Sequence, residues 1–298
     1  MLVVDGSPPE VFRQHARHFE GRSRHLPVDR RFGYHNDKVN GIHTGVEQAS
    51  TEKIILADDD IRYTVAQINA LARLLDEVEV VRPQNYLAPL SFVGKMEAAR
   101  MLINRATLAT GDYPGTCAFR RESFQAADHY DGDVLFDNEE LIRHFAREGA
   151  QVRYALDFFV RKRPPALDKW LEQRPRQAYE DFPLRAKSAL FFSLAPTVLI
   201  AFLLGGRKAG AIVLASLGLA ASGLAAAGRA RGEASKYFPV SICLFAPLWM
   251  IERSLSSWWA LFWFLRRGGY PFGETILARG VGRDWFAGGR IAAEQLKR

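Results

Sequence analysis

Three consecutive carboxylates, Asp58, Asp59 and Asp60, directly follow a short apolar run of the sequence. The run 54–57 is aliphatic and predicts a buried strand that ends where the carboxylates begin. This edge of an open α/β sheet is where ligands bind. Adjacent like charges repel unless a cation lies among them, and hard cations such as Mg²⁺ and Mn²⁺ bind carboxylate and phosphate oxygens. The stretch therefore favours a metal and diphosphate site, with a solvated acidic turn as the alternative.

The elements that would position these carboxylates alternate between predicted strands and helices over the first 160 residues. The helix expected over 64–75 has one apolar face, which is typical of packing on a sheet. Strands are predicted at the first residues, 54–57, 79–82 and 152–160, and helices at 11–19, 64–75, 95–109 and from about 137 to Gly149. This alternation predicts a wound α/β sheet.

Two uncharged apolar stretches follow, over 188–206 and 209–228, and basic residues border both. Each has about the 20 residues needed to cross a hydrocarbon core of about 30 Å. Small residues dominate the second stretch, as in helices that pack closely in lipid. We therefore expect a transmembrane hairpin over 187–228, with buried helices of a soluble domain as the alternative.

A third apolar stretch, 237–265, contains Glu252 and Arg253 and ends in a tryptophan-rich piece. The two charges are expected to divide it, which favours a re-entrant or membrane-surface helix, with a tilted third span as the alternative. The loop 229–236 is basic, so it is expected in the cytoplasm together with the domain over 1–186. The expected location is the inner or plasma membrane, and 229–298 would hold the third segment and a cytoplasmic tail.

The net charge of +7 does not indicate nucleic-acid binding, because the basic residues are scattered and several border the apolar stretches. The two cysteines, Cys117 and Cys243, are far apart. They predict neither a disulfide framework nor a zinc site.

Short motifs occur in order along residues 2–186. They are Val-Val-Asp5-Gly-Ser, Lys38-Val-Asn-Gly-Ile, Asp58-Asp59-Asp60-Ile-Arg62, Pro114-Gly-Thr with Phe119-Arg-Arg, Asp137-Asn138-Glu139-Glu140-Leu, and Gln173-Arg174-Pro-Arg176-Gln. In this order and spacing the sequence resembles the family 2 glycosyltransferases, which are inverting enzymes of the GT-A fold that use nucleotide sugars. The apolar stretches after residue 186 match a layout common in that family.

The resemblance implies a nucleotide-sugar site and a divalent cation, Mg²⁺ or Mn²⁺, held by Asp58 and Asp60. The residues implied in donor binding are Asp5, Lys38, Asp58, Arg62, Gln173, Arg174 and Arg176. A cation at the two aspartates would neutralise the charge that develops on a diphosphate leaving group.

Inversion requires a base that accepts the proton of the acceptor hydroxyl. The family places this base in a Glu-Asp pair, and here Asn138 stands at the second position, where an amide cannot accept the proton. The role then falls to Asp137 first, Glu140 second, or Glu139. The alternative is that these carboxylates only favour the helix dipole.

The sequence therefore predicts transfer of a sugar from a nucleotide diphosphate sugar to an acceptor at the cytoplasmic membrane face, with a lipid or lipid-linked acceptor favoured. The family pattern has a strand and helix before the first motif, and this sequence begins at the second strand. This departure supports an alternative, a non-catalytic, membrane-anchored remnant of the fold that acts as a scaffold. A nucleotidyltransferase is a weaker alternative, because no basic, glycine-rich phosphate loop is present.

Overall fold

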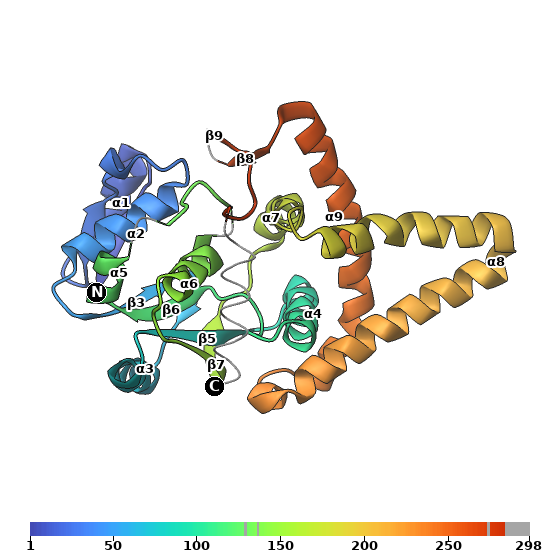
Figure 1. The fold of residues 1–298 in the computed structure, drawn as a ribbon, viewed down its shortest axis with the longest axis horizontal. Helices are drawn as coiled ribbons and strands as arrows, with labels where there is room; N and C mark the ends of the chain where they lie inside the picture. The colour runs from blue at the N-terminus through green and yellow to red at the C-terminus, as the bar shows by residue number, and fades with distance from the viewer. Residues whose placement is uncertain (128–129, 136, 273–274, 284–298) are drawn as a thin grey trace.

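The computed structural model describes residues 1–127, 130–135, 137–272 and 275–283 (Figure 1). An α/β half contains most of the chain up to about residue 180, and long helices extend from one side of it. The mixed α/β class and the predicted strand before the carboxylates are confirmed.

A five-stranded sheet forms the centre of the α/β half. Its strand order is β3 (Lys53–Ala57), β6 (Thr116–Arg120), β5 (Val80–Leu87), β7 (Val152–Lys162) and β4 (Ile61–Arg62). Among these strands β5 and β7 are parallel, whereas the β3–β6, β5–β6 and β4–β7 pairs are antiparallel. The sheet is therefore mixed rather than uniformly parallel.

The first strand of the chain lies apart from this sheet. β1 (Leu2–Asp5) pairs in parallel with β2 (Arg24–Pro27), and the two form a separate two-stranded sheet. Between them run α1 (Pro9–Phe19) and a tight turn; η1 (Arg30–Phe32) and α2 (Asp37–Gln48) follow. Helix α2 packs on β1, and a Cβ added at Gly45 would be in van der Waals contact with the Val4 side chain, 3.4 Å away.

Helices cover both faces of the five-stranded sheet because successive strand residues point to opposite sides. On one face α3 (Val65–Glu77) buries Leu71 and Leu75 against alternate residues of β5 and β6. On the other face α6 (Asp137–Arg147) and α2 bury a cluster that includes Phe119 and Phe145. The remaining helices of this half are α4 (Phe92–Thr107), α5 (Arg121–Ala126) and α7 (Leu167–Glu180).

Two long arms of α8 (Arg185–Ala230) form the hairpin that projects from the α/β half (Figure 1). The arms meet at Gly206, whose φ of 71° is left-handed and breaks the helical path. The base of the second arm contacts α4 so closely that a Cβ on Gly228 would lie 1.9 Å from the carbonyl oxygen of Leu102. Towards the bend the side chains are exposed, and Leu204 is 86% exposed.

Helix α9 (Ala246–Arg267) crosses the base of the hairpin, after the short helices η2 (Gly232–Lys236) and η3 (Val240–Phe245). It continues as one helix through Glu252 and Arg253, the two charges that interrupt the third apolar stretch. The helix tolerates them because they face the α/β half: Arg253 lies 3.3 Å from Asp181, and Glu252 lies 3.7 Å from Arg174 of α7. The strands β8 (Tyr270–Phe272) and β9 (Thr275–Leu277) follow.

Candidate functional site

Side chains from four separate elements meet at the carboxyl end of β3. Asp58 follows β3, Lys38 lies in the first turn of α2, and Asp137 and Asn138 begin α6. Lys162 is the last residue of β7. We refer to these five residues, with Asp60, as the carboxylate–lysine site: Lys38, Asp58, Asp60, Asp137, Asn138 and Lys162, of which the first four are sequence-predicted site residues.

Lys38 joins the predicted motifs of α2, β3 and α6. Its Nζ lies 2.8 Å from Asp58 Oδ1 and 2.8 Å from Asp137 Oδ2, and it donates to Asn138 Oδ1 at 3.0 Å. The amide of Asn138 in turn donates to Asp58 at 3.3 Å. One ammonium and one amide therefore orient two carboxylates that lie 79 positions apart in the chain (137 − 58).

The charges at this site shift one another's pKa values. Burial raises the pKa of Asp58, but Lys38 and Lys162 outweigh it, so the pKa lies below its ordinary value. Burial likewise lowers the pKa of Lys38, but Asp137 and Asp58 outweigh it and hold the pKa well above its ordinary value. Lys38 and Asp58 are thus charged partners across the neutral range.

Lys162 is held beside the carboxylates by strand pairing. Its Cα partner in the β4–β7 ladder is Ile61, and the N–H of Arg163 donates to the carbonyl of Asp60 at 2.8 Å. Its Nζ consequently lies 3.4 Å from Asp60 Oδ2 and 3.9 Å from Asp58 Oδ2. This lysine lies outside the sequence motifs. The available signal was its place just after a predicted strand, in the basic run 161–163.

Asp60 has a buried carboxylate oxygen without a hydrogen-bond donor. Its Oδ1 is buried and accepts no hydrogen bond among the described residues. Burial raises its pKa, with further contributions from the charges of Asp58 and Asp59, while Lys162 acts in the opposite direction. A buried carboxylate oxygen without a donor is costly, so this atom favours an additional cation or donor.

The donor set fits a divalent cation of the Mg²⁺ or Mn²⁺ type. Asp58 and Asp60 supply hard oxygen atoms, and Asp60 Oδ1 has a vacant bonding direction. The described residues include no group of three or more His, Cys, Asp or Glu side chains placed to hold a metal. A cation here would therefore use two carboxylates and take further oxygens from a bound phosphate, as Mg²⁺ commonly does.

The other two predicted base candidates point elsewhere. Glu139 is 1% exposed and accepts from Arg82 Nη2 at 2.9 Å and from Arg143 Nε at 3.1 Å. Glu140 is fully buried, 3.1 Å from Arg147 Nη2, and accepts a backbone N–H of the C-terminal segment at 3.1 Å. Burial raises the pKa of Glu140, and Arg147 opposes that effect. Of the three carboxylates, Asp137 is the one that lies within the carboxylate–lysine site.

Two other predicted donor-binding residues, Asp5 at the end of β1 and Arg62 at the end of β4, contact residues near them in the chain or in the neighbouring strand. Asp5 accepts the N–H of Ser7 at 2.9 Å, and its Oδ2 lies 2.7 Å from His15 and 2.9 Å from His25. Burial raises the pKa of Asp5, but these hydrogen bonds outweigh it and lower the pKa well below its ordinary value. Arg62 donates to the backbone carbonyl of Asp59 in the acidic turn at 2.6 Å and to that of Ile61 in β4 at 2.7 Å.

The three predicted donor residues of α7 have different surroundings. Arg174 is 3% exposed, 3.0 Å from Glu97 of α4 and 3.7 Å from Glu252 of α9. It therefore joins three helices. Arg176 donates to a backbone carbonyl in the segment before α6 at 3.2 Å, next to the start of the Asp137 helix. Gln173 is partly exposed on the same helix.

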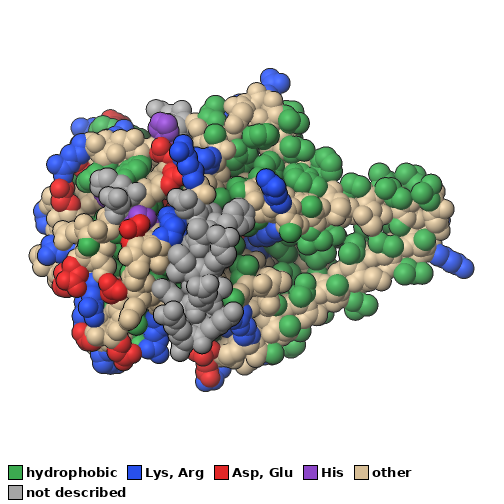
Figure 2. Space-filling view, viewed as in Figure 1, with side chains coloured by type: hydrophobic (Ala, Val, Ile, Leu, Met, Phe, Trp, Pro, Cys, Tyr) green, Lys and Arg blue, Asp and Glu red, His purple; other side chains and the backbone are tan. Residues whose placement is uncertain are grey.

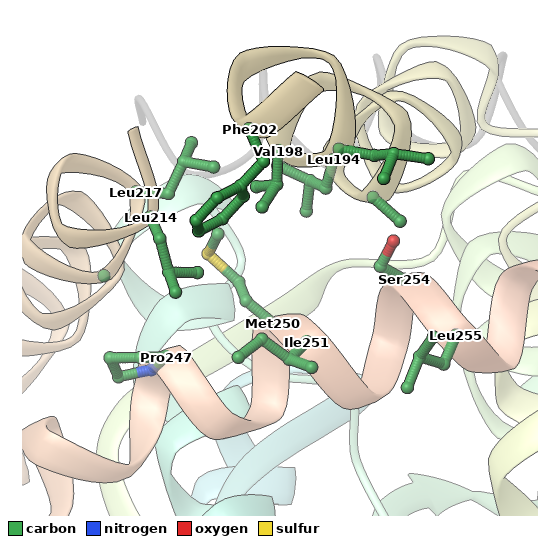
Figure 3. Close-up of a pocket in the computed structure, with 13 residues that line it drawn as sticks. Leu194, Val198, Phe202, Leu214, Leu217, Pro247, Met250, Ile251, Ser254 and Leu255 are labelled. Atoms are coloured by element: carbon green, nitrogen blue, oxygen red, sulfur yellow. The ribbon is translucent and has the colours of Figure 1, made fainter. Parts of the chain in front are cut away.

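The helical half presents a large apolar surface, whereas charged side chains gather over the α/β half (Figure 2). Helix α8 is long and apolar enough to be a candidate membrane span, with a mean hydropathy of 2.1 and 11% of its most apolar window buried. A cavity of about 330 Å³ lies between the arms of α8 and α9 (Figure 3). Its lining is apolar and includes Val198, Phe202, Leu214, Met250 and Leu255.

Comparison with known proteins gives distant structural likenesses. No protein-family model and no curated protein sequence matches the chain. A mannosyltransferase from Pyrobaculum calidifontis, solved in complex with GDP-Man and Mn²⁺, has a TM-score of 0.45 and 18% sequence identity to it. The similarity covers 87% of this chain and 77% of the other. At this level the likeness is no evidence for a shared activity.

Proposed function

We propose that this chain is a glycosyltransferase that moves a sugar, with inversion, from a nucleotide diphosphate sugar to an acceptor at the cytoplasmic face of a membrane. The observation that supports this most is the convergence of Lys38, Asp58, Asp60 and Asp137 from three separate elements. These residues come from three of the motifs by which the sequence resembles family 2 glycosyltransferases.

The donor diphosphate would lie against the carboxyl end of β3. Asp58 and Asp60 would hold a divalent cation there, and Asp60 Oδ1 has a free bonding direction for it. The cation supplies positive charge that stabilises the departing diphosphate. Arg62 supports the acidic turn through its contact with the Asp59 carbonyl.

Asp137 is the proposed base. In an inverting transfer the acceptor oxygen attacks the anomeric carbon, the bond from that carbon to the phosphate oxygen breaks, and the acceptor proton passes to the base. Asp137 begins α6 beside Asp58, and Lys38 fixes its carboxylate at 2.8 Å. The ion pairs of Glu139 and Glu140 leave both outside this group.

The apolar surface of α8 and α9 supports a lipid acceptor. A hydrocarbon phase would cover side chains such as Leu203 and Leu219, which are 72% and 75% exposed. Large aromatic side chains on α9, including Trp258 and Trp259, are also exposed and would suit the membrane interface. The cavity between α8 and α9 would accommodate part of an acceptor chain.

Calorimetry of nucleotide-sugar binding tests the proposal. The full chain in detergent is titrated with UDP- and GDP-sugars, with Mn²⁺ or with EDTA. We expect metal-dependent binding that Asp60→Asn weakens by about tenfold or more, since one ion–ligand contact is lost. Asp59→Asn is the matched control, because Asp59 is an exposed neighbour with the same charge. If the unmodified chain binds no donor, the transferase proposal fails and the scaffold alternative is favoured.

A further inference from the structure

Strand pairing holds Lys162 beside Asp58 and Asp60 of the acidic turn. The pairing of β4 with β7 fixes its backbone opposite Ile61, directly after Asp60. Its Nζ lies 3.4 Å from Asp60 Oδ2 and 3.9 Å from Asp58 Oδ2. Its side chain is 27% exposed, so the ion pairs are only partly screened by water.

The glycine across from Lys162 leaves room for this ammonium. A Cβ added at Gly115 would lie 3.0 Å from Lys162 Nζ and 3.2 Å from Asp58 Oδ2. The backbone of Gly115 is fixed, because its N–H donates to Asn85 at 2.9 Å and its carbonyl accepts from the N–H of Asp58 at 3.0 Å. The space at the acidic turn is thus shaped around the lysine head group.

The ion pairs show which ammonium lies beside Asp60. Asp58, Asp60 and Asp137 contribute −3 and Lys38 and Lys162 contribute +2, so these five groups sum to −1. The Lys38 ammonium lies between Asp58 and Asp137. Lys162 is therefore the ammonium that balances Asp60.

We infer that Lys162 is a resident counter-ion, and that a divalent cation must displace its ammonium to reach Asp58 and Asp60. An ammonium and a dication cannot share two carboxylates at about 3–4 Å without strong repulsion. The protein without donor is then nearly charge-balanced, and a metal alone binds it weakly. The inference rests on the metal site of the proposed function and adds to it a residue that opposes metal binding.

Binding of Mn²⁺ alone, followed by the loss of its free electron paramagnetic resonance signal, tests this role. The variant Lys162→Met keeps the side-chain stem and removes the charge. We expect Mn²⁺ to bind this variant about tenfold or more tightly than the unmodified chain, because one nearby like charge is removed. Lys162→Arg keeps the charge and should bind as weakly as the unmodified chain. Arg161→Met is the matched control, because Arg161 is the exposed preceding residue and contacts the backbone of Ala88 instead.

The outcomes separate this inference from the proposed function. Tighter Mn²⁺ binding by Lys162→Met that is lost on adding Asp60→Asn supports the inference. Equal binding by the unmodified chain and Lys162→Met, still lost with Asp60→Asn, overturns the inference and leaves the metal site intact. Mn²⁺ binding that is absent in all variants also overturns the inference, whereas the proposed function is decided separately by the titration with donor and Mn²⁺. Circular dichroism of each variant establishes that the fold is retained.

Discussion

Glu139→Gln and Asp137→Asn should separate a structural carboxylate from a functional one. Glu139 is buried with Arg82, which is fully buried, and also contacts Arg143. Removing its charge leaves a buried guanidinium without its counter-ion, which costs about 3 kcal/mol at the lower end of measured values. Asp137 pairs with Lys38, whose side chain is 37% exposed and which remains paired with Asp58 when the charge of Asp137 is removed. Asp137→Asn should therefore lower the free energy of unfolding by about 1 kcal/mol or less.

Thermal unfolding of the full chain in detergent measures this difference. At about 2–4 °C for each kcal/mol, Glu139→Gln should lower the Tm by about 6–12 °C, and Asp137→Asn by no more than about 4 °C. In a sugar-transfer assay the order reverses: Asp137→Asn should lose transfer, and Glu139→Gln should retain it below its own Tm. A Glu139→Gln variant with unchanged Tm and no transfer would refute this assignment of the base.

Two further predictions concern stability. Burial raises the pKa of Glu180 from 4.5 to about 7. Its contribution to the free energy of unfolding is therefore fully present below pH 4.5 and is lost as the pH rises through about 7, a difference of about 3 kcal/mol. Glu180→Gln should therefore raise the Tm at pH 8 but not at pH 4, and identical pH profiles for the two proteins would contradict the pKa. Gly228→Ala places a methyl 1.9 Å from the Leu102 carbonyl and should destabilise the chain by about 1–3 kcal/mol, whereas Gly223→Ala meets open space and should be neutral or stabilising by up to about 1 kcal/mol. Thermal unfolding compares the two, and equal effects would argue against the close contact of α8 with α4.

Local sequence signals were sufficient to predict the strand before Asp58 and the helix that begins near Asp137. The strand is indicated by an aliphatic run that ends in charged residues, and the helix by carboxylates that precede a helical apolar pattern. Both signals involve only residues that are close together in the chain. The two arms of α8 were predictable for the same reason, since length and composition alone define them. The break between them coincides with a glycine, which adopts the left-handed conformation readily.

Long-range pairings could not be predicted in the same way. Lys162 reaches the acidic turn only because β7 pairs with β4, about 100 residues earlier in the chain. Arg174 was expected at the donor, but its partners Glu97 and Glu252 come from two other helices, and no local pattern indicates that they meet. The donor contact of Arg174 stays a prediction without support from its present neighbours.

The central claim is that Asp137 acts as the base in sugar transfer at the carboxylate–lysine site. The most direct test incubates the full chain with radiolabelled UDP- and GDP-sugars, Mn²⁺ and extracted membrane lipids, and follows label into the lipid phase. The account predicts transfer with inverted anomeric configuration, lost in Asp137→Asn although that variant still binds the donor. Transfer that continues at the wild-type rate in Asp137→Asn would contradict the assignment of the base. No transfer from any donor, to lipid or to soluble sugar acceptors, would contradict the transferase account.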